Sequence, residues 1–194
     1  MTLTDDAPSR PRVEGDRETE ILDACLEVLV EVGYDRLTMD AVAMRARASK
    51  ATLYRRWEGK EELVVSALAH SKGPFEVPDT GSLRGDLIAS HCGHQAPEQR
   101  ERLAALLTTV ATNPTFAARF HAEVIAPRVA RTREIWERAR LRGEVADDLD
   151  IDLLAPALPG IVLHRAFVLG DPPDEACVAR IVDHVILPAA TRGA

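Results

Sequence analysis

Apolar residues recur at steps of three and four along most of this chain, which is the spacing of one face of an α-helix. In the first third, Gly33 is placed to end one apolar stretch as a C-terminal cap, and Gly59 separates two others. Thr38 and Ser49 stand where N-caps are preferred. We expect four helices in this part of the chain, over residues 16–32, 39–46, 49–57 and 60–71.

The same helical spacing returns after a segment rich in proline and glycine, residues 72–82, which is not compatible with a regular helix. We expect a kink or a split at Pro127, and kinks at Pro156 and Pro159, because proline lacks the amide that a helix interior uses. No alternating apolar pattern indicates a strand, so the expected fold class is all-α. The expected helices span residues 83–95, 98–112, 114–142, 151–169 and 174–188. Their breaks come at Pro97, Asn113-Pro114, Gly143 and Asp171-Pro172-Pro173.

The chain of 194 residues is long enough for a small domain followed by a larger one. With 46% apolar and 28% charged residues it has the composition of a soluble globular protein. No run approaches the roughly 18 consecutive apolar residues of a membrane helix, and the polar N-terminus does not look like a secretory signal. We therefore expect a cytoplasmic protein with no membrane partner. The expected organisation is an arm at 1–14, a first domain at 15–72 and a second at 73–194.

The formal net charge is −7, yet the charge is unevenly distributed. The stretch from residue 36 to residue 60 holds seven bases and two acids, Asp40 and Glu58, which leaves +5. A basic segment in an acidic chain indicates a local surface that contacts phosphates. Its bases are Arg36, Arg45, Arg47, Lys50, Arg55, Arg56 and Lys60.

Three short helices, with a tight turn between the last two and a basic surface, have the geometry of a helix-turn-helix. Lys50, Ala51 and Thr52 begin the third helix, where side chains reach base edges. Tyr54 and the two arginines that follow it lie one turn further on, within reach of flanking phosphates.

The run from residue 32 to residue 68, VGYDRLTMDAVAMRARASKATLYRRWEGKEELVVSAL, resembles the N-terminal domain of the tetracycline-repressor (TetR) family. This resemblance implies an all-helical dimeric regulator, usually a repressor, whose C-terminal helices form a ligand pocket and whose last two helices pack against a second subunit. The matching positions are Gly33-Tyr34, Leu37-Thr38, Val42-Ala43, Ser49-Lys50, Thr52-Leu53-Tyr54, Trp57 and Lys60-Glu61-Glu62-Leu63.

The chain departs from the family in the turn before the third helix, where Arg47 and Ala48 stand in place of the usual glycine and valine. Glycine there accommodates a left-handed backbone, and arginine in that conformation costs on the order of 1 kcal/mol. The turn either keeps this geometry or adopts a slightly different one. In either case Arg47 can add a contact to phosphate.

The expected partners are a double-stranded palindromic DNA operator, a small and mainly apolar effector, and a second copy of the chain in a homodimer. Each partner has its own set of expected contact residues. The DNA-binding set is Thr38, Arg47, Ser49, Lys50, Ala51, Thr52, Tyr54, Arg55 and Lys60. The effector set is His91, Leu106, Val110, Phe120, Trp136, His164 and Phe167. The dimer set is Leu158, Val162, Val178, Ile181, Val182, Val185 and Ile186. For the dimer set the alternative is that these residues complete the core of one chain.

Other functions find less support in the sequence. His91, Cys92 and His94, with His121, suit zinc or copper, but no second His/Cys pair completes a set. No GxSxG, P-loop or dinucleotide motif indicates an enzyme, and we expect no cofactor. The acids at 147, 148, 150 and 152 precede a helix whose positive end they favour. A DNA-binding module that acts through protein partners, without a ligand, remains an alternative.

Overall fold

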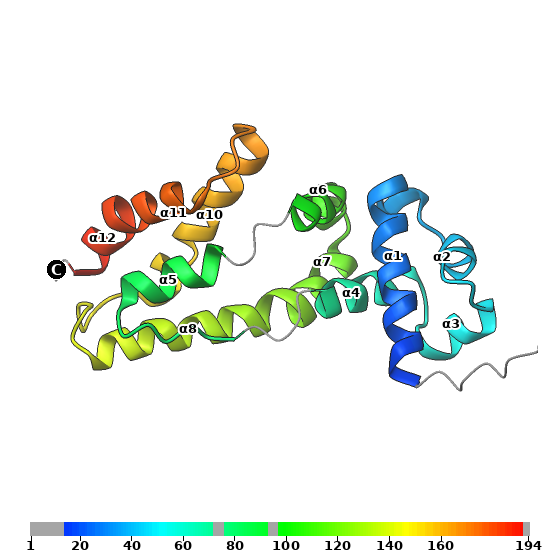
Figure 1. Ribbon diagram of the computed structural model, residues 1–194, viewed down its shortest axis with the longest axis horizontal. Helices are drawn as coiled ribbons and strands as arrows, with labels where there is room; N and C mark the ends of the chain where they lie inside the picture. Colours follow the sequence, from blue (N-terminus) through cyan, green and yellow to red (C-terminus); the bar gives the residue numbers. More distant parts are fainter. Residues whose placement is uncertain (1–13, 72–75, 93–96, 192–194) are drawn as a thin grey trace, which may run out of the picture. The chain divides into compact units, whose positions relative to one another are not determined.

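The computed structural model describes residues 14–71, 76–92 and 97–191, and every regular element in these ranges is helical (Figure 1). The expected all-α fold class is therefore confirmed. The chain divides into two compact units, the first ending at Ser71 and the second beginning at Lys72. Apart from Glu14, the expected arm at residues 1–14 lies outside the described residues.

The first unit consists of α1 and three shorter helices that pack around it. The helix α1 packs on α2 and on α4, and α2 packs on α3. The backbone of α1 departs from helical geometry at Gly33, whose φ of 75° and ψ of 165° suit glycine, as the sequence predicts. The bounds are α1 Glu14–Arg36, α2 Met39–Arg45, α3 Lys50–Arg56 and α4 Lys60–Ser71.

Both N-caps expected in this unit are confirmed. The Thr38 hydroxyl accepts a hydrogen bond from the Ala41 amide at 3.1 Å, and the Ser49 hydroxyl accepts one from the Thr52 amide at 3.1 Å. The short helix α3 is anchored to the core by Leu53 and by Trp57 directly after it, which are 0% and 4% exposed. The opposite face of α3 is therefore left to solvent.

The second unit has its core where α5 packs against α8, α11 and η3 (Figure 1). The largest fully buried side chain is that of Trp136, on α8. The bounds are α5 Leu83–Cys92, α6 Pro97–Thr112, α7 Pro114–Phe120, η1 His121–Ile125, α8 Ala126–Leu141, α9 Ile151–Leu154, α10 Ala157–Leu163, η2 His164–Val168, α11 Glu175–Ile181, η3 Val182–Ile186 and α12 Leu187–Thr191. The elements written η are single turns of π-helix.

Prolines modify the helices of the second unit in two ways. A π-helical turn directly precedes the helices that carry Pro127 and Pro188 near their start, so the extra residue accommodates the missing amide. The expected disturbance at Pro127 is thereby confirmed. Pro156 separates α9 from α10, whereas the kink expected at Pro159 is wrong. Pro159 lies in the first turn of α10, where no amide is needed for the helix.

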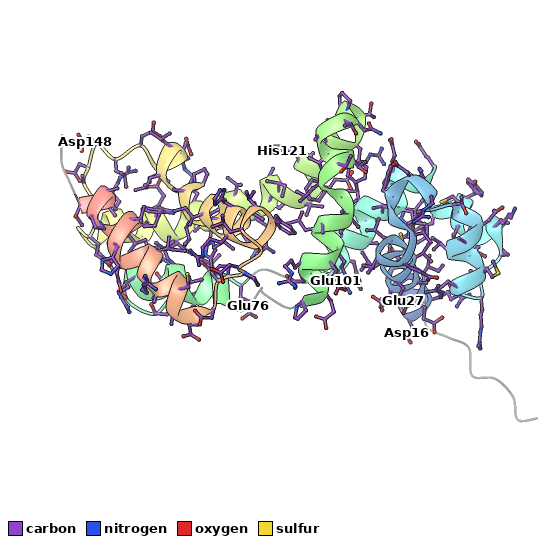
Figure 2. All side chains as sticks on the ribbon, turned by 90° about the horizontal axis from the view of Figure 1, so that it is seen from above. Asp16, Glu27, Glu76, Glu101, His121 and Asp148 are labelled. Carbon is purple, nitrogen blue, oxygen red and sulfur yellow. The ribbon has the colours of Figure 1, made fainter. Side chains whose placement is uncertain are left out.

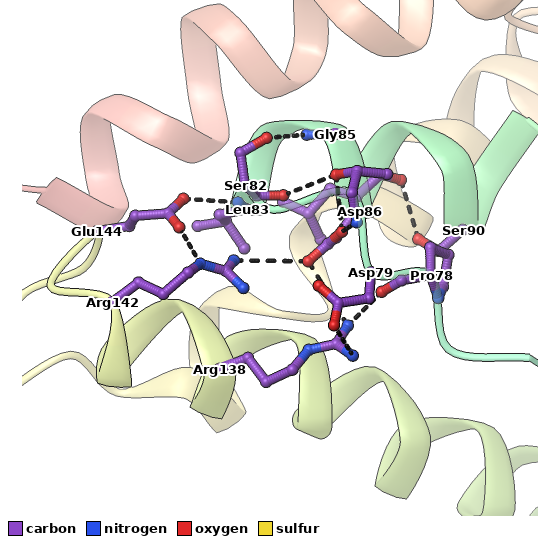
Figure 3. A network of polar contacts seen from close by, with 12 residues as sticks. Pro78, Asp79, Ser82, Leu83, Gly85, Asp86, Ser90, Arg138, Arg142 and Glu144 are labelled. Carbon is purple, nitrogen blue, oxygen red and sulfur yellow. Dashed lines mark hydrogen bonds and ion pairs between the residues drawn. The ribbon is translucent and has the colours of Figure 1, made fainter.

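A buried carboxylate ties α5 to α8 and to the segment before α5 (Figure 3). The side chain of Asp86 is 0% exposed, and its Oδ1 accepts hydrogen bonds from the Thr80 amide at 2.6 Å and the Thr80 hydroxyl at 2.8 Å. Its Oδ2 lies 3.5 Å from guanidinium nitrogens of both Arg138 and Arg142. Arg142 also pairs with Glu144, whose second oxygen accepts from the Leu83 amide at the start of α5.

The stretch Ile151–Val168 has a mean hydropathy of 1.4, so by length and composition alone it could cross a membrane. The sequence analysis counted consecutive apolar residues and found no run of that length. A hydropathy average gives a different result because it tolerates interspersed polar residues, here Asp152 and Arg165. Only 11% of the stretch is buried within the chain. Most of its apolar side chains are half-buried, and Leu153, Leu163 and Val168 are exposed.

Candidate nucleic-acid interface

The turn between α2 and α3 is a Schellman motif with a non-glycine residue at its left-handed position. The Ala48 amide donates to the Ala43 carbonyl at 2.8 Å and the Arg47 amide to the Met44 carbonyl at 3.1 Å, which satisfies the last carbonyls of α2. Arg47 has a φ of +51°, the only positive φ of a non-glycine residue in the described part of the chain. The turn therefore keeps the left-handed geometry, at a cost on the order of 1 kcal/mol.

The helix α3 presents an exposed polar face of the kind that a recognition helix needs. Lys50, Ala51 and Arg55 are exposed and Tyr54 is 56% exposed, while Leu53 is buried on the opposite side. Thr52 is half-buried, and its hydroxyl lies 2.8 Å from that of the capping Ser49. Thr38 and Ser49 are exposed, with one oxygen each already accepting an amide.

Several bases of the basic segment are paired with acids within the first unit. Lys50 Nζ lies 2.6 Å from Asp40 on α2, and Arg56 lies 2.6 Å from Glu18 on α1. Arg45 binds two further carboxylates of α1, that of Glu27, labelled in Figure 2, and that of Glu31. The excess of +5 read from the sequence is therefore partly neutralised by acids of α1 that lie far away in the sequence.

Lys60 lies against the C-terminal end of α1. Its Nζ donates to the carbonyls of Tyr34 at 3.1 Å and Asp35 at 3.3 Å, and lies 4.4 Å from the centre of the Tyr34 ring. Burial and the neighbouring Glu61 carboxylate raise the pKa of Tyr34 above its usual range. Lys60 thus braces α1 against the start of α4 in the free protein.

Three side chains of the expected DNA-binding set have no hydrogen-bond or ion-pair partner within the described ranges. These are the guanidinium groups of Arg47 and Arg55 and the hydroxyl of Tyr54. All three residues are exposed. They lie on the turn before α3 and on α3 itself, so they are the groups of this unit most readily available to an incoming anion.

The residues expected to bind an effector are spread over two parts of the second unit. Leu106 and Phe120 are buried, and Phe120 stacks on Phe116 with 6.1 Å between ring centres. Trp136 belongs instead to the core that α5, α8, α11 and η3 share. Its indole Nε1 is buried and has no hydrogen-bond acceptor among the described residues, which is uncommon because such a group normally costs about 1–3 kcal/mol.

The remaining effector candidates are less enclosed. Val110 and Phe167 are half-buried, and His164 is exposed. His91 is half-buried, and its Nδ1 lies 3.0 Å from the Ser90 hydroxyl and 3.0 Å from the Leu87 carbonyl.

The alternative metal site is not assembled within the described ranges, which contain no group of three or more His, Cys, Asp or Glu side chains able to hold a metal ion. His121 is exposed on η1 (Figure 2), and His94 lies outside the described residues. In the acidic cluster, Asp150 caps α9, its Oδ1 accepting from the Leu153 amide at 3.0 Å. This acid therefore acts at the helix start, where the sequence indicated that it would be favourable.

Most residues of the expected dimer set are buried in the core of the single chain, which agrees with the alternative that they complete that core. A stripe at three- and four-residue spacing marks a buried face without indicating which neighbour buries it. Val162 is half-buried, and Val185 at 46% is the exposed member of the set. The core members are Leu158, Val178, Ile181, Val182 and Ile186, between 0% and 8% exposed.

Comparison with known proteins identifies the class to which this geometry belongs. Residues 21–67 match the family model of bacterial regulatory proteins of the tetR family, and residues 77–185 match that of a tetracyclin repressor-like C-terminal domain. The chain belongs to the TetR family. Its members are DNA-binding transcriptional regulators rather than enzymes, typically ligand-responsive and dimeric.

Two relatives align with nearly the whole chain. An HTH-type transcriptional regulator of Mycobacterium tuberculosis (strain H37Rv) is 40% identical over 99% of this chain and 96% of its own length. A DNA-binding transcriptional repressor TetR of Mycobacteroides abscessus is 36% identical, with 92% and 96% covered. The chain is thus similar to a named repressor over both of its units.

Solved structures share the fold. A TetR family transcription regulator matches with a TM-score of 0.71 and 28% identity, covering 91% of this chain and all of the other. The regulator FadR from Bacillus subtilis, solved in complex with stearoyl-CoA, matches with a TM-score of 0.69 and 18% identity, covering 88% and 96%. The second likeness concerns the fold alone.

The polar contacts that α1 makes with the helix-turn-helix were missed by the sequence reading. Arg17 donates from Nη2 to the Arg47 carbonyl at 2.6 Å, and Glu18 pairs with Arg56. The only signal in the sequence was a helix start that mixes acids and bases, which is equally typical of a solvated helix face. These partners lie 30 and 38 positions apart, beyond any local pattern.

Proposed function

We propose that this chain binds a palindromic double-stranded operator in the cytoplasm as a homodimer and is released from it by a small, mainly apolar effector. The observation that carries the DNA-binding part is the exposed surface of the α2–α3 turn and α3. There Arg47, Tyr54 and Arg55 have no partner within the described residues. Unpaired bases and a phenol next to a recognition helix are groups that bind backbone phosphates.

Lys50 can contact base edges or phosphates once DNA replaces its present partner, Asp40. Its ammonium is paired with Asp40 in the free protein, and both side chains are more than half exposed. An exposed ion pair contributes at most about 1 kcal/mol, so DNA can replace Asp40 at little cost. The full DNA-binding set remains Thr38, Arg47, Ser49, Lys50, Ala51, Thr52, Tyr54, Arg55 and Lys60. Lys60 acts in it mainly by holding α1 against α4.

The test starts from a duplex selected from a randomised pool by the wild-type chain. Arg55→Met is expected to weaken binding to every duplex and to reduce the slope of log affinity against log salt by about 0.9, as the loss of one phosphate contact does. Tyr54→Phe is expected to weaken binding with a smaller change of slope. Arg100→Met, which removes an exposed base of α6, is the control. Unchanged affinity and slope in both α3 variants would remove α3 from the DNA surface.

The effector part rests on Trp136, a buried donor without an acceptor among the described residues, in the core of the second unit. Small-molecule sites combine an apolar lining with a few placed polar groups, and an indole N–H supplies such a group. We infer an effector with an apolar body and a hydrogen-bond acceptor. An effector that prefers the arrangement unable to bind DNA releases the operator only to the extent of that preference.

Stearoyl-CoA is a suitable first probe because it combines an apolar chain with carbonyl and phosphate acceptors. If it is of the right class, it raises the melting temperature of the protein and lowers its affinity for the selected duplex. Trp136→Phe keeps an aromatic ring and removes the donor, and should weaken the response to the probe about tenfold with DNA affinity unchanged. A response of equal strength in Trp136→Phe would exclude the indole from the effector site.

A homodimer is supported by the apolar surface that the second unit leaves exposed. Leu163, Val168, Leu169 and Val185 are 41%, 70%, 58% and 46% exposed. They belong to or adjoin α10, η2 and η3, and α10 packs on η3. Exposed apolar side chains gathered on neighbouring helices of a regulator are typical of a protein–protein interface. Two copies would place two recognition helices in successive major grooves about 34–36 Å apart.

A further inference from the structure

The α2–α3 turn and the end of α8 have the same backbone geometry but different residues at the left-handed position. After α8, the Gly143 amide donates to the Arg140 carbonyl at 3.0 Å and the Glu144 amide to the Ala139 carbonyl at 3.0 Å, with a φ of +71° at Gly143. The turn after α2 has the same two bonds, with Arg47 in the place of glycine. Arg47 therefore holds a conformation that its side chain disfavours, and its surroundings must stabilise it.

One side chain outside the turn provides this stabilisation. Arg17, in the early part of α1, donates from Nη2 to the Arg47 carbonyl at 2.6 Å. Within the described residues no side chain donates to the carbonyl of Gly143, which needs no such support. The second terminal nitrogen of Arg17 binds Glu20 one turn along α1, and the Arg17 side chain is only 24% exposed. A held guanidinium makes this a charge-assisted hydrogen bond, to a carbonyl on the exposed turn.

The neighbouring residue of α1 reaches the other end of the recognition helix. Glu18 pairs with Arg56, in the last turn of α3, at 2.6 Å. Because α3 has seven residues and is anchored to the core through Leu53 and Trp57 alone, its direction depends on what holds its two ends. The Arg56 pair, and the pair of Lys50 with Asp40 at the start of α3, are more than a third exposed on both sides and contribute little. Among the polar contacts of this turn and helix, the one from Arg17 comes from the least exposed side chain.

We propose that Arg17 is a positioning residue for DNA recognition, which fixes the left-handed turn at Arg47 and thereby the direction of α3 without itself contacting DNA. This inference rests on the proposed DNA-binding function. A basic side chain in a DNA-binding unit can have either of two roles. A phosphate contact contributes to affinity and to its salt dependence, whereas a positioning residue contributes to affinity alone.

The experiment uses the full chain and a duplex selected from a randomised pool by the wild type. The variants are Arg17→Met, Arg17→Lys, Arg47→Gly and the double variant Arg17→Met/Arg47→Gly. Arg17→Met should weaken binding about tenfold with the salt slope unchanged, and Arg17→Lys should recover part of the loss. In the Arg47→Gly background, where the turn needs no support, Arg17→Met should weaken binding less than about threefold. Arg100→Met controls for the loss of a positive charge.

A second readout needs no DNA. In the free protein, hydrogen exchange at the Ala48 amide, which closes the motif, should be faster in Arg17→Met and return to the wild-type rate in the double variant. Exchange in α4 should be the same in all variants, which shows that the unit remains folded.

The outcomes are distinguishable. A wild type that selects no duplex contradicts the DNA-binding function, while the exchange measurement still tests the contact with Arg47. A salt slope reduced by about one in Arg17→Met would make Arg17 a phosphate contact and overturn the proposal. If Arg17→Met caused the same loss in the wild-type and Arg47→Gly backgrounds, or left the Ala48 exchange rate unchanged, the proposal would also be overturned.

Discussion

Asp86 shows how much of the second unit depends on a single residue. Its carboxylate is 0% exposed and is shared by Thr80, Arg138 and Arg142 (Figure 3). In the sequence it is one acid in the first turn of a helix, which is a common and solvated position. Its burial could not be predicted, because the two arginines lie more than fifty positions away and their approach depends on how α5 packs on α8.

Asp86→Ala should lower the free energy of unfolding by about 2–3 kcal/mol, measured by urea unfolding. The change leaves two guanidinium groups facing each other and a Thr80 amide without its acceptor. Loss of a fully buried partner would cost more, but both arginine side chains are about 30% exposed and water replaces part of the interaction. Asp79→Ala is the matched control, because Asp79 pairs with the same Arg138 but is 64% exposed. An equally small loss for both variants would contradict the special role of the buried carboxylate.

Cys25 is the second residue whose environment sets its chemistry. It is 0% exposed in the core of the first unit, and burial raises the pKa of its thiol to about 12. Since the thiolate is the reactive form, Cys25 should be inert in the folded protein. In a Cys92→Ser/Cys177→Ser chain, a disulfide reagent such as Ellman's should react slowly at pH 8 and at least a hundred times faster in urea. Rapid reaction without urea would show that the core of this unit opens readily.

Elements were the level at which sequence reasoning was most successful. The caps at Thr38 and Ser49, the break at Gly33 and the disturbance at Pro127 all depend on local chemistry, which the sequence contains. The predicted kink at Pro159 was also based on local chemistry, and it was wrong. Pro159 does not kink α10, because the helix begins only two residues earlier. Helix starts within a continuous apolar stretch depend on packing, so the sequence could not place this one.

The cap of α11 provides a quantitative test at this scale. The Asp174 carboxylate accepts a hydrogen bond from the Cys177 amide at 2.7 Å directly after the Pro172-Pro173 break. Asp174→Ala should lower the free energy of unfolding by about 1 kcal/mol, as the loss of an N-cap does. Asp174→Asn keeps an acceptor, so it should lower the free energy of unfolding by only a few tenths of that amount. If urea unfolding gave equal losses for the two variants, the charge rather than the hydrogen bond would be the stabilising feature.

For the molecule as a whole, the sequence predicted the class of protein but not the distribution of surfaces. The basic segment suggested an open positive surface, and the structure pairs several of its members with acids of α1, such as Glu18 and Glu27. The apolar stripe at the end of the chain suggested an interface, and the structure buries most of it in one chain. In both cases the sequence marks a surface, whereas the neighbour that covers it is set by tertiary packing.

The dimer can be tested on the residues that remain exposed. An obligate hydrophobic interface buries roughly 2,000 Å² or more, and a charge placed within it would be desolvated without a partner. Leu163→Glu/Val185→Glu should therefore shift the mass in solution at low micromolar concentration from twice 21.2 kDa to 21.2 kDa, and should weaken binding to the selected duplex.

The same test has a control and a contrast. Leu141→Glu places the same charge at a leucine that is 89% exposed at the end of α8, and that variant should stay dimeric. Val182→Glu would instead bury a charge in the core of the single chain and lower its melting temperature, because Val182 is 0% exposed. A Leu163→Glu/Val185→Glu protein that keeps the doubled mass would place the interface on another face. If Val182→Glu made the protein monomeric without changing its melting temperature, the dimer set predicted from the sequence would be the contact between subunits.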